Sequence, residues 1–338
     1  MTKNSSSGAT ARVAMVGCGY WGKNVLRNFS DLGALAAVSD ANPGLAEEFA
    51  AKYGVPSRSL QDILSDPSYD GVAFATPAEL HVDHVSAALN AGKHVFVEKP
   101  LALEVSDGVA LADLAKRAGR ILMVGHLLQY HPLLLKLLEL SREDRFGKIR
   151  HAYSNRLNLG KVRLEEDVVW SFAPHDISVV LALLGEMPRS VSVKSTAILN
   201  RDIADIADIN MDFSEGVSAR IFVSWLNPFK EQKLVVIGER AQAVFDDTLP
   251  WNEKLTVYDH KVVLKDGRPE AEKAPGEKII VDQREPLREE CSHFLDCIAR
   301  GATPRTDSAE ALRVLSTLDA ARRSSRTGDA VAPKSVVG

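Results

Sequence analysis

Apolar and polar residues alternate along the first third of the chain in a regular order of short β-type runs and helical patterns. Five apolar runs are predicted as strands, at residues 12–17, 34–39, 71–75, 93–97 and 121–124. Apolar positions with helical spacing predict helices over 22–30, 44–53, 60–65, 79–91 and 105–118. Strands that alternate with helices in this way are typical of a doubly wound parallel sheet of the α/β class.

The pattern changes after residue 126. A buried helix is predicted over 133–138, another begins near Ala173-Pro174, and amphipathic helices cover 289–300 and 307–324. Strand-like runs lie close together at 149–157, 189–198, 207–213, 217–225, 232–237, 242–246, 254–258 and 261–264. Many strands at short spacing predict a largely antiparallel sheet in a second, α+β domain. We therefore expect domains at 11–126 and 127–331, with flexible tails at 1–10 and 332–338.

Composition excludes several classes of protein. The 338 residues exceed the usual size of a single core, and 41 Lys and Arg against 45 Asp and Glu leave no strong field for a nucleic acid. The first ten residues are Ser-rich and lack the apolar core of a signal peptide, and no apolar run is long enough for a membrane span. Three cysteines without metal-ligand spacing are expected to be reduced thiols. These features favour a cytoplasmic enzyme or binding protein without a metal.

The first predicted strand leads into a glycine motif. Gly17, Gly19 and Gly22 form a G-x-G-x-x-G with Tyr20 and Trp21 between the last two glycines. The first glycine makes the tight turn, the second lets the backbone approach phosphates, and the third allows the helix to pack on the strand. The helix that follows directs backbone N–H groups and its positive end at an anion. The motif predicts a pyrophosphate site.

A carboxylate strengthens this prediction. The second predicted strand ends at Asp40, about 20 residues past the glycines, where a dinucleotide site places the acid that binds the adenosine ribose. Asp40 favours NAD over NADP because it would repel a 2′-phosphate, and the three residues that follow it, 41–43, include no arginine to hold such a phosphate. Further polar residues come directly after later strands, at Thr76-Pro77, Glu98-Lys99-Pro100 and Gly125-His126. Ligands of such sheets bind at the carboxyl ends of the strands, so these residues are expected to share one edge.

These residues resemble the glucose-fructose oxidoreductase, inositol dehydrogenase and MocA (GFO/IDH/MocA) family. The resemblance rests on Glu98-Lys99-Pro100 within residues 91–101, on Thr76 to His81, and on motifs at 173–176, 183–185, 285–287 and 294–296. It implies a Rossmann domain, a C-terminal domain with a large open sheet that forms a homodimer or homotetramer, and NAD(P)-dependent oxidation or reduction of a sugar or cyclitol. It also implies cofactor contacts from Thr76, Pro77, His81, Glu98 and Lys99.

The resemblance implies that Lys99 is the proton donor and acceptor at the reacting hydroxyl, and its place after a strand fits this role because desolvation there would lower the pKa of an ammonium group. Glu98 is expected to order the loop or to bind the cofactor ribose. Family members often have a cis bond before this proline.

His175 is the second catalytic candidate. The family usually has Asp four residues before this histidine, but here that position is Ser171, and Asp176 directly follows. Without the upstream carboxylate, more of the acid–base work is expected of Lys99. The remaining substrate-binding candidates are His126, Gln129, Tyr130, Arg156, Ser171, Asp176 and Trp225, where a packing role for Trp225 is equally compatible with the sequence.

The glycine loop and the helix around Ala173 to Asp176 look most like the family branch that acts on nucleotide-linked sugars. We expect oxidation of a secondary hydroxyl, with C3 of a UDP-linked N-acetylhexosamine as the sharpest hypothesis, giving a ketosugar for a downstream aminotransferase. The alternatives are an inositol or free-sugar dehydrogenase, a ketosugar reductase, and a noncatalytic NAD-binding regulator.

Overall fold

The computed structural model describes residues 11–336 except 144, 161 and 165. The predicted N-terminal tail, residues 1–10, lies outside this part of the chain. The chain forms two compact units, one comprising residues up to 127 together with 285–312, and the other comprising 128–284 together with the residues from 313 onward. The segment 285–312 thus belongs to the first unit, whereas its position in the sequence suggested the second domain.

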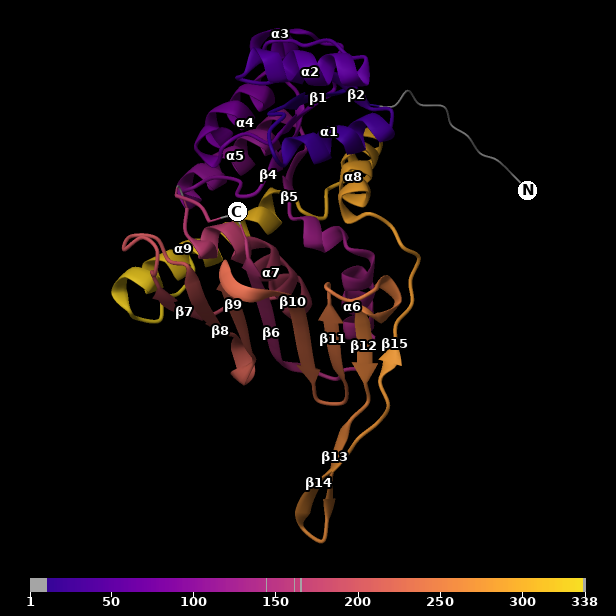
Figure 1. Cartoon of the computed structure of the whole chain (residues 1–338), viewed down its shortest axis with the longest axis vertical. Coiled ribbons are helices and arrows are strands. Elements are labelled where there is room, and N and C mark those ends of the chain that lie inside the picture. Colours follow the sequence, from indigo (N-terminus) through magenta and orange to yellow (C-terminus); the bar gives the residue numbers. More distant parts are fainter. Residues whose placement is uncertain (1–10, 144, 161, 165, 337–338) are drawn as a thin grey trace, which may run out of the picture. The chain divides into compact units, whose positions relative to one another are not determined.

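The first unit contains a five-stranded parallel sheet (Figure 1). Its strands run in the order β2-β1-β3-β4-β5, with bounds β1 (Val13–Val16), β2 (Leu35–Ser39), β3 (Gly71–Phe74), β4 (His94–Glu98) and β5 (Leu122–Gly125). All four strand pairs are parallel. The chain moves to one side of β1 and then to the other, which creates the switch point where such sheets bind ligands. The predicted doubly wound sheet is confirmed.

Helices of the first unit follow the predicted pattern closely. They are α1 (Gly22–Asp31), α2 (Pro43–Tyr53), α3 (Leu60–Ser65), η1 (Ala78–Leu80), α4 (His81–Asn90), α5 (Val105–Ala118) and α8 (Pro286–Arg300), followed by the start of α9 (Ser308–Thr327). Local signals explain their ends. The side chain of Asn42 accepts the N–H of Gly44, Pro43 opens α2, and Gly54 closes it in the left-handed conformation. Helix α1 packs on α8, and α4 packs on α5.

The second unit is built on an eight-stranded sheet. Its strands run in the order β15-β12-β11-β10-β6-β9-β8-β7, with bounds β6 (Ile149–Leu159), β7 (Ser190–Thr196), β8 (Ile206–Asp212), β9 (Ser218–Ser224), β10 (Leu226–Gly238), β11 (Gln242–Asp246), β12 (Leu255–Tyr258) and β15 (Glu277–Lys278). Only the pair β6 and β9 is parallel among these described strands. The predicted mostly antiparallel sheet is confirmed.

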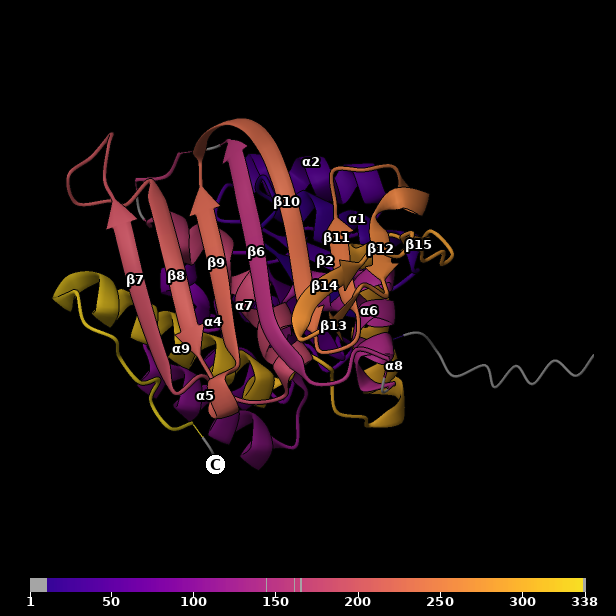
Figure 2. The ribbon, with the colours of Figure 1, turned by 90° about the horizontal axis from the view of Figure 1, so that it is seen from below.

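Helices cover one face of this sheet. They are η2 (Leu127–Tyr130), α6 (Pro132–Arg142) and α7 (Val168–Leu184), and the short turns η3 (Ser214–Gly216) and η4 (Trp251–Glu253) lie between strands. Helix α7 packs against β6, β8 and β9. Figure 2 views the sheet from its other face, which no helix of the described residues covers. A separate hairpin, β13 (Lys261–Lys265) and β14 (Arg268–Glu272), extends beyond the end of the sheet (Figure 1).

One prediction for the second unit was wrong. Helix α7 begins at Val168 rather than near Ala173, because the side chain of Asp167 accepts the N–H of Trp170 at 3.0 Å and caps the helix there. Pro174 therefore lies inside α7. Near the C-terminal end, Val331 pairs with Val191, and the carbonyl groups of Ala332 and Lys334 accept hydrogen bonds from α9.

Candidate active site

The glycine loop between β1 and α1 has the shape that a pyrophosphate requires. Gly17 has a φ of +93°, and a Cβ atom there would lie 2.6 Å from the carbonyl oxygen of Ala75. A Cβ atom at Gly22 would overlap the carbonyl oxygen of Gly17, so the close start of α1 also requires glycine. A Cβ atom at Gly19 would meet no atom within 4 Å. That open space is where the backbone of such a loop approaches phosphates.

Asp40 is tied directly to this loop. One carboxylate oxygen accepts the backbone N–H of Cys18 at 2.6 Å, and the other accepts the N–H of Asn42 at 2.8 Å. Each carboxylate oxygen has a second lone pair, which can accept a hydrogen bond from a ribose hydroxyl. A groove of about 600 Å³ opens beside Cys18 and Gly19, between α1 and α2. The loop, the carboxylate and the groove together fit a dinucleotide.

The predicted cofactor ligands after β3 have different surroundings. Thr76 lies within 3.3 Å of the His84 ring through its hydroxyl group, and Pro77 is exposed. His81 is only 1% exposed, with one ring nitrogen 2.7 Å from the carbonyl oxygen of Pro100 and the other 2.9 Å from that of Thr76. Burial lowers the pKa of His81. Its imidazole therefore joins the loops that follow β3 and β4.

Glu98 is the last residue of strand β4 and Lys99 follows it directly, and the Lys99–Pro100 bond is cis, as the family resemblance implied. The indole N–H of Trp21 donates to Glu98 Oε1 at 2.6 Å. Burial raises the pKa of Glu98 to about 7, while the bond from Trp21 works in the opposite direction. Tyr20, the other residue inside the glycine motif, is 77% exposed and lies below the ammonium group of Lys23.

Two acidic residues beside this strand end were not predicted. His126, expected to contact substrate, is 2% exposed and pairs through Nδ1 with Glu310 Oε2 at 2.6 Å. Glu290 of α8 is 1% exposed, and burial, followed by the charges of Glu98 and Glu310, raises its pKa well above the usual range. The sequence does carry a signal for Glu290, because it occupies the buried stripe of α8 together with Leu287, Cys291 and Phe294.

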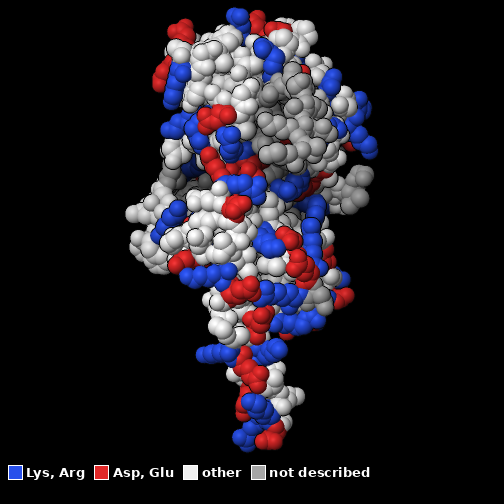
Figure 3. Space-filling model, turned by 90° about the vertical axis from the view of Figure 1, so that its right-hand side faces the viewer, with Lys and Arg blue, Asp and Glu red and all other residues white. Residues whose placement is uncertain are grey.

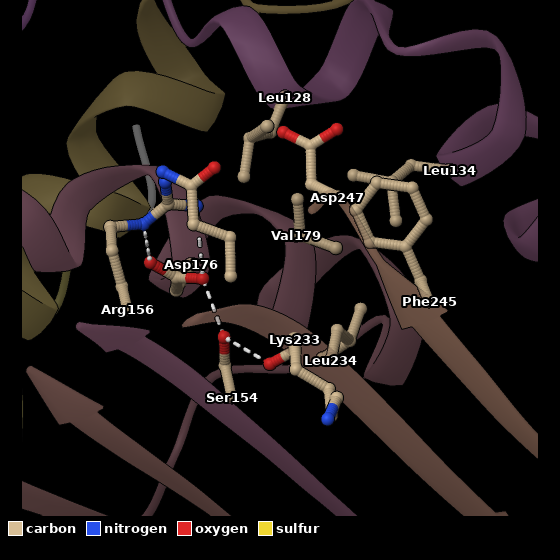
Figure 4. Close-up of a pocket in the computed structure, with 11 residues that line it drawn as sticks. Leu128, Leu134, Ser154, Arg156, Asp176, Val179, Lys233, Leu234, Phe245 and Asp247 are labelled. Atoms are coloured by element: carbon tan, nitrogen blue, oxygen red, sulfur yellow. Dashed lines mark hydrogen bonds and ion pairs between the residues drawn. The ribbon is translucent and has the colours of Figure 1, made fainter. Parts of the chain in front are cut away.

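In the second unit, Arg156 and Asp176 form a buried ion pair (Figure 4). The Nε atom of Arg156 donates to Asp176 Oδ2 at 2.5 Å, and the hydroxyl of Ser154 donates to Oδ1 at 2.6 Å. Burial works against the guanidinium charge, but Asp176 raises the pKa of Arg156. The pair lies in a small pocket whose apolar walls include Val179 and Phe245. Both charged groups were predicted substrate ligands, and the structure joins them to each other.

The remaining candidates of the second unit lie on or near helix α7. His175 is half-buried in the interior of α7, four residues after the buried Ser171. Gln129 donates to the carbonyl oxygen of Ser178 at 3.3 Å, and Tyr130 is 1% exposed. Trp225 is fully buried, and its indole N–H donates to Asp205 Oδ1 at 2.5 Å. The packing role that the sequence left open for Trp225 agrees with this burial.

The charged surface is mixed in sign. On the face shown in Figure 3, acidic and basic side chains alternate, including over the hairpin that projects at the bottom.

Within the described part of the chain, no helix has both the length and the apolar character that crossing a membrane requires. The same residues contain no group of three or more His, Cys, Asp or Glu placed to hold a metal ion. All three cysteines are buried free thiols, and burial followed by the charge of Asp40 raises the pKa of Cys18 to about 12.

Comparisons with known proteins identify the class. Residues 11–126 match the family model for the GFO/IDH/MocA oxidoreductases with an NAD-binding Rossmann fold, and residues 134–244 match the model for the GFO/IDH/MocA C-terminal domain. The chain therefore belongs to the GFO/IDH/MocA family. It is an oxidoreductase that acts on CH–OH groups, and its NAD-binding Rossmann domain makes NAD its cofactor.

Relatives of known activity match nearly the full chain. The UDP-N-acetylglucosamine 3-dehydrogenase of Acidithiobacillus ferrooxidans is 27% identical over 305 residues, which cover 90% of this chain and 94% of that protein. A solved structure of that enzyme matches 93% of this chain and 96% of its own with a TM-score of 0.82. The scyllo-inositol 2-dehydrogenase (NAD(+)) of Bacillus subtilis is 25% identical and covers 94% of both chains.

Proposed function

We propose that the protein oxidises a secondary hydroxyl of a nucleotide-linked sugar to a ketone, with C3 of a UDP-linked N-acetylhexosamine as the reacting carbon. The observation that carries the proposal is the match to the UDP-N-acetylglucosamine 3-dehydrogenase, which extends through both units of the chain. A downstream aminotransferase would consume the ketosugar. The inositol dehydrogenase relative, matched over the same share of the chain, supports an inositol or free sugar as the second candidate substrate.

Bound NAD would supply the acceptor for the hydride that leaves the carbinol carbon. Lys99, at the carboxyl end of β4, takes the hydroxyl proton as the C–O single bond becomes a carbonyl, so that the substrate loses one hydride and one proton. His175 holds or relays that proton and contacts the sugar. The glycine loop and Asp40 bind the pyrophosphate and the ribose hydroxyls. Each of these residues does its part without a metal ion.

The uncovered face of the eight-stranded sheet supports a homodimer or homotetramer in this proposal. Residues on this face alternate with those that contact α7, and they include the half-buried Tyr153 and Phe222 beside the Arg220–Asp208 ion pair. A broad sheet face with aromatic side chains is stabilised when a second copy covers it.

A substrate panel tests the reaction. UDP-N-acetylglucosamine, UDP-N-acetylgalactosamine, other UDP-sugars, free sugars and inositols are incubated with the enzyme and NAD, and NADH is followed by absorbance. Turnover is expected with a UDP-N-acetylhexosamine. Turnover with inositols alone selects the second candidate, and tight NAD binding without turnover on any alcohol contradicts an enzymatic function.

Lys99→Ala tests the role of the lysine. Loss of a general base typically costs 10²–10⁴-fold in rate, so kcat should fall by about that factor while the Kd for NAD changes by less than about threefold. The matched control is Lys116→Ala, because Lys116 is exposed on α5. Near-wild-type turnover by Lys99→Ala, with folding and NAD binding intact, would show that another group accepts the proton.

A further inference from the structure

Trp21 connects the two functional segments of the first unit. It is the last residue before Gly22 in the glycine motif, and it is 38% exposed at the start of α1. Its indole N–H reaches across to Glu98 Oε1, 2.6 Å away at the end of β4. The two residues are 77 positions apart in the sequence. One hydrogen bond therefore joins the dinucleotide loop to the strand that presents Lys99.

The Glu98 carboxyl also holds the backbone of Lys99. Besides the indole, it accepts the backbone N–H of Lys99. On its other side it lies against Gly125, where a Cβ atom would come within 2.9 Å of Oε2. Strands β4 and β5 pair at this point, Glu98 opposite Gly125, so the glycine leaves the space that the carboxyl fills. The carboxyl is thus fixed between the indole, the lysine backbone and β5.

Other charged groups around Glu98 come from each neighbouring element. Lys99 directly follows Glu98 past the end of β4, His126 follows β5, and Glu290 projects from α8. Glu310 of α9 is bound to His126. Burial, followed by the charges of Glu98 and Glu310, raises the pKa of Glu290 well above its usual range, and the Oε1 atom of Glu290 has no hydrogen-bond partner. The pKa of Glu98, which burial raises to about 7, places its change of charge near neutral pH.

We propose that Trp21 is a positioning residue for Lys99, acting through the Glu98 carboxylate, so that the loop that binds the dinucleotide and the backbone of the catalytic lysine are held as one piece. The inference rests on the proposed role of Lys99. It adds Trp21, which takes no part in the proton or hydride transfer itself. An ionised Glu98 accepts both N–H groups strongly, since hydrogen bonds to a charged acceptor are the stronger kind. Protonation of Glu98 weakens both of these hydrogen bonds, because its carboxyl group is then a neutral acceptor.

Trp21→Phe isolates this contact, because it removes the N–H donor and keeps an aromatic ring. Loss of the donor raises the pKa of Glu98 further, since the indole bond favours the ionised form. Glu98→Gln is the complementary variant, because its amide oxygen still accepts the indole N–H but no longer titrates. Trp170→Phe is the matched control, because Trp170 lies in the second unit.

Indole fluorescence reports the contact in the free protein. The chain has four tryptophans, and the wild-type spectrum minus that of Trp21→Phe isolates the emission of Trp21. Between about pH 5.5 and 8.5, a step centred near the pKa of Glu98 is expected in the wild type and in Trp170→Phe. Glu98→Gln should lose the step. A Trp21 emission that is flat across this range, or a step that persists in Glu98→Gln, would overturn the proposal.

Competitive acylation of lysines reports the position of Lys99. The reactivity of Lys99 relative to exposed Lys116 is measured by mass spectrometry without substrate, and it should change at least about threefold in Trp21→Phe and stay constant in Trp170→Phe. An unchanged ratio in Trp21→Phe overturns the positioning role. Measured against pH in the wild type, the same ratio should change near the pKa of Glu98. If Trp21→Phe does not fold, Glu98→Gln decides, because it should remove that change, and a change that persists in Glu98→Gln contradicts the proposal. Both readouts stand apart from the substrate panel, so a failed panel refutes the function and leaves this inference to its own tests.

Discussion

Replacing Asp176 by alanine should destabilise the second unit, because the change leaves the guanidinium group of Arg156 buried without its counter-ion. The Arg156 side chain is 15% exposed and that of Asp176 is 6% exposed. The carboxylate accepts two N–H bonds from Arg156 and one O–H bond from Ser154. Breaking one partner of such a buried pair costs about 3–5 kcal/mol.

The expected change is large enough to measure by calorimetry. For a unit of this size, 1 kcal/mol corresponds to roughly 2–4 °C in Tm, so the lower bound of about 3 kcal/mol corresponds to a fall of roughly 6–12 °C. Glu270→Ala is the matched control, because it breaks the Lys265–Glu270 pair on the β13–β14 hairpin, whose side chains are 54% and 55% exposed. An exposed pair contributes about 0–1 kcal/mol, so this variant should unfold close to the wild type.

A double replacement, Arg156→Met with Asp176→Leu, separates a missing counter-ion from lost packing. Apolar residues of similar volume often replace a buried ion pair without loss, so the double variant should recover most of the stability that Asp176→Ala loses. The reasoning is refuted if Asp176→Ala and Glu270→Ala unfold at the same temperature. A stable Asp176→Ala that loses turnover would instead assign Asp176 to the substrate, as the sequence suggested.

Two further predictions concern the cofactor and the assembly. Asp40→Ser should weaken NAD binding about tenfold in calorimetry and reduce the preference for NAD over NADP, because it removes the ribose acceptor and the negative charge; unchanged NAD affinity would contradict the assignment. Phe222→Asp, on the uncovered sheet face, should shift the mass measured by light scattering toward the monomer, whereas Val262→Asp on the exposed hairpin should not; equal masses for wild type and Phe222→Asp would place the interface elsewhere.

Local patterns predicted the elements of the first unit because each local signal agrees with the fold. The buried strands are short apolar runs, and glycine or proline stands where each turn requires it. The start of α7 was missed because one local signal, a proline, was assigned to the wrong position in the helix. Pro174 was interpreted as a first-turn proline, while the cap at Asp167 lies seven residues earlier. Strands β14 and β15 were not predicted, because their residues are exposed and carry no apolar periodicity.

Site residues were predicted where a motif fixes their place and missed where distant segments meet. The glycine loop and Asp40 are close in sequence, so their spacing indicated their contact. Glu310 pairs with His126 across 184 positions, and the Trp21–Glu98 bond spans 77, so no local pattern indicates either contact. Such pairs become visible only when the sheet brings the strand ends together.

The sequence left open which carboxylate assists His175, and the structure narrows that choice. Position 171, where the family usually has Asp, is Ser, and the Asp176 carboxyl is bound by Arg156 and Ser154 on the side of α7 that faces the sheet. Neither position supplies a carboxylate to raise the basicity of the histidine. In the proposed reaction the acid–base work then falls on Lys99, whose backbone N–H is bound to Glu98. Because the pKa of Glu98 is about 7, turnover should change with pH near neutrality in the wild type and lose that change in Glu98→Gln, which the pH profile of kcat measures.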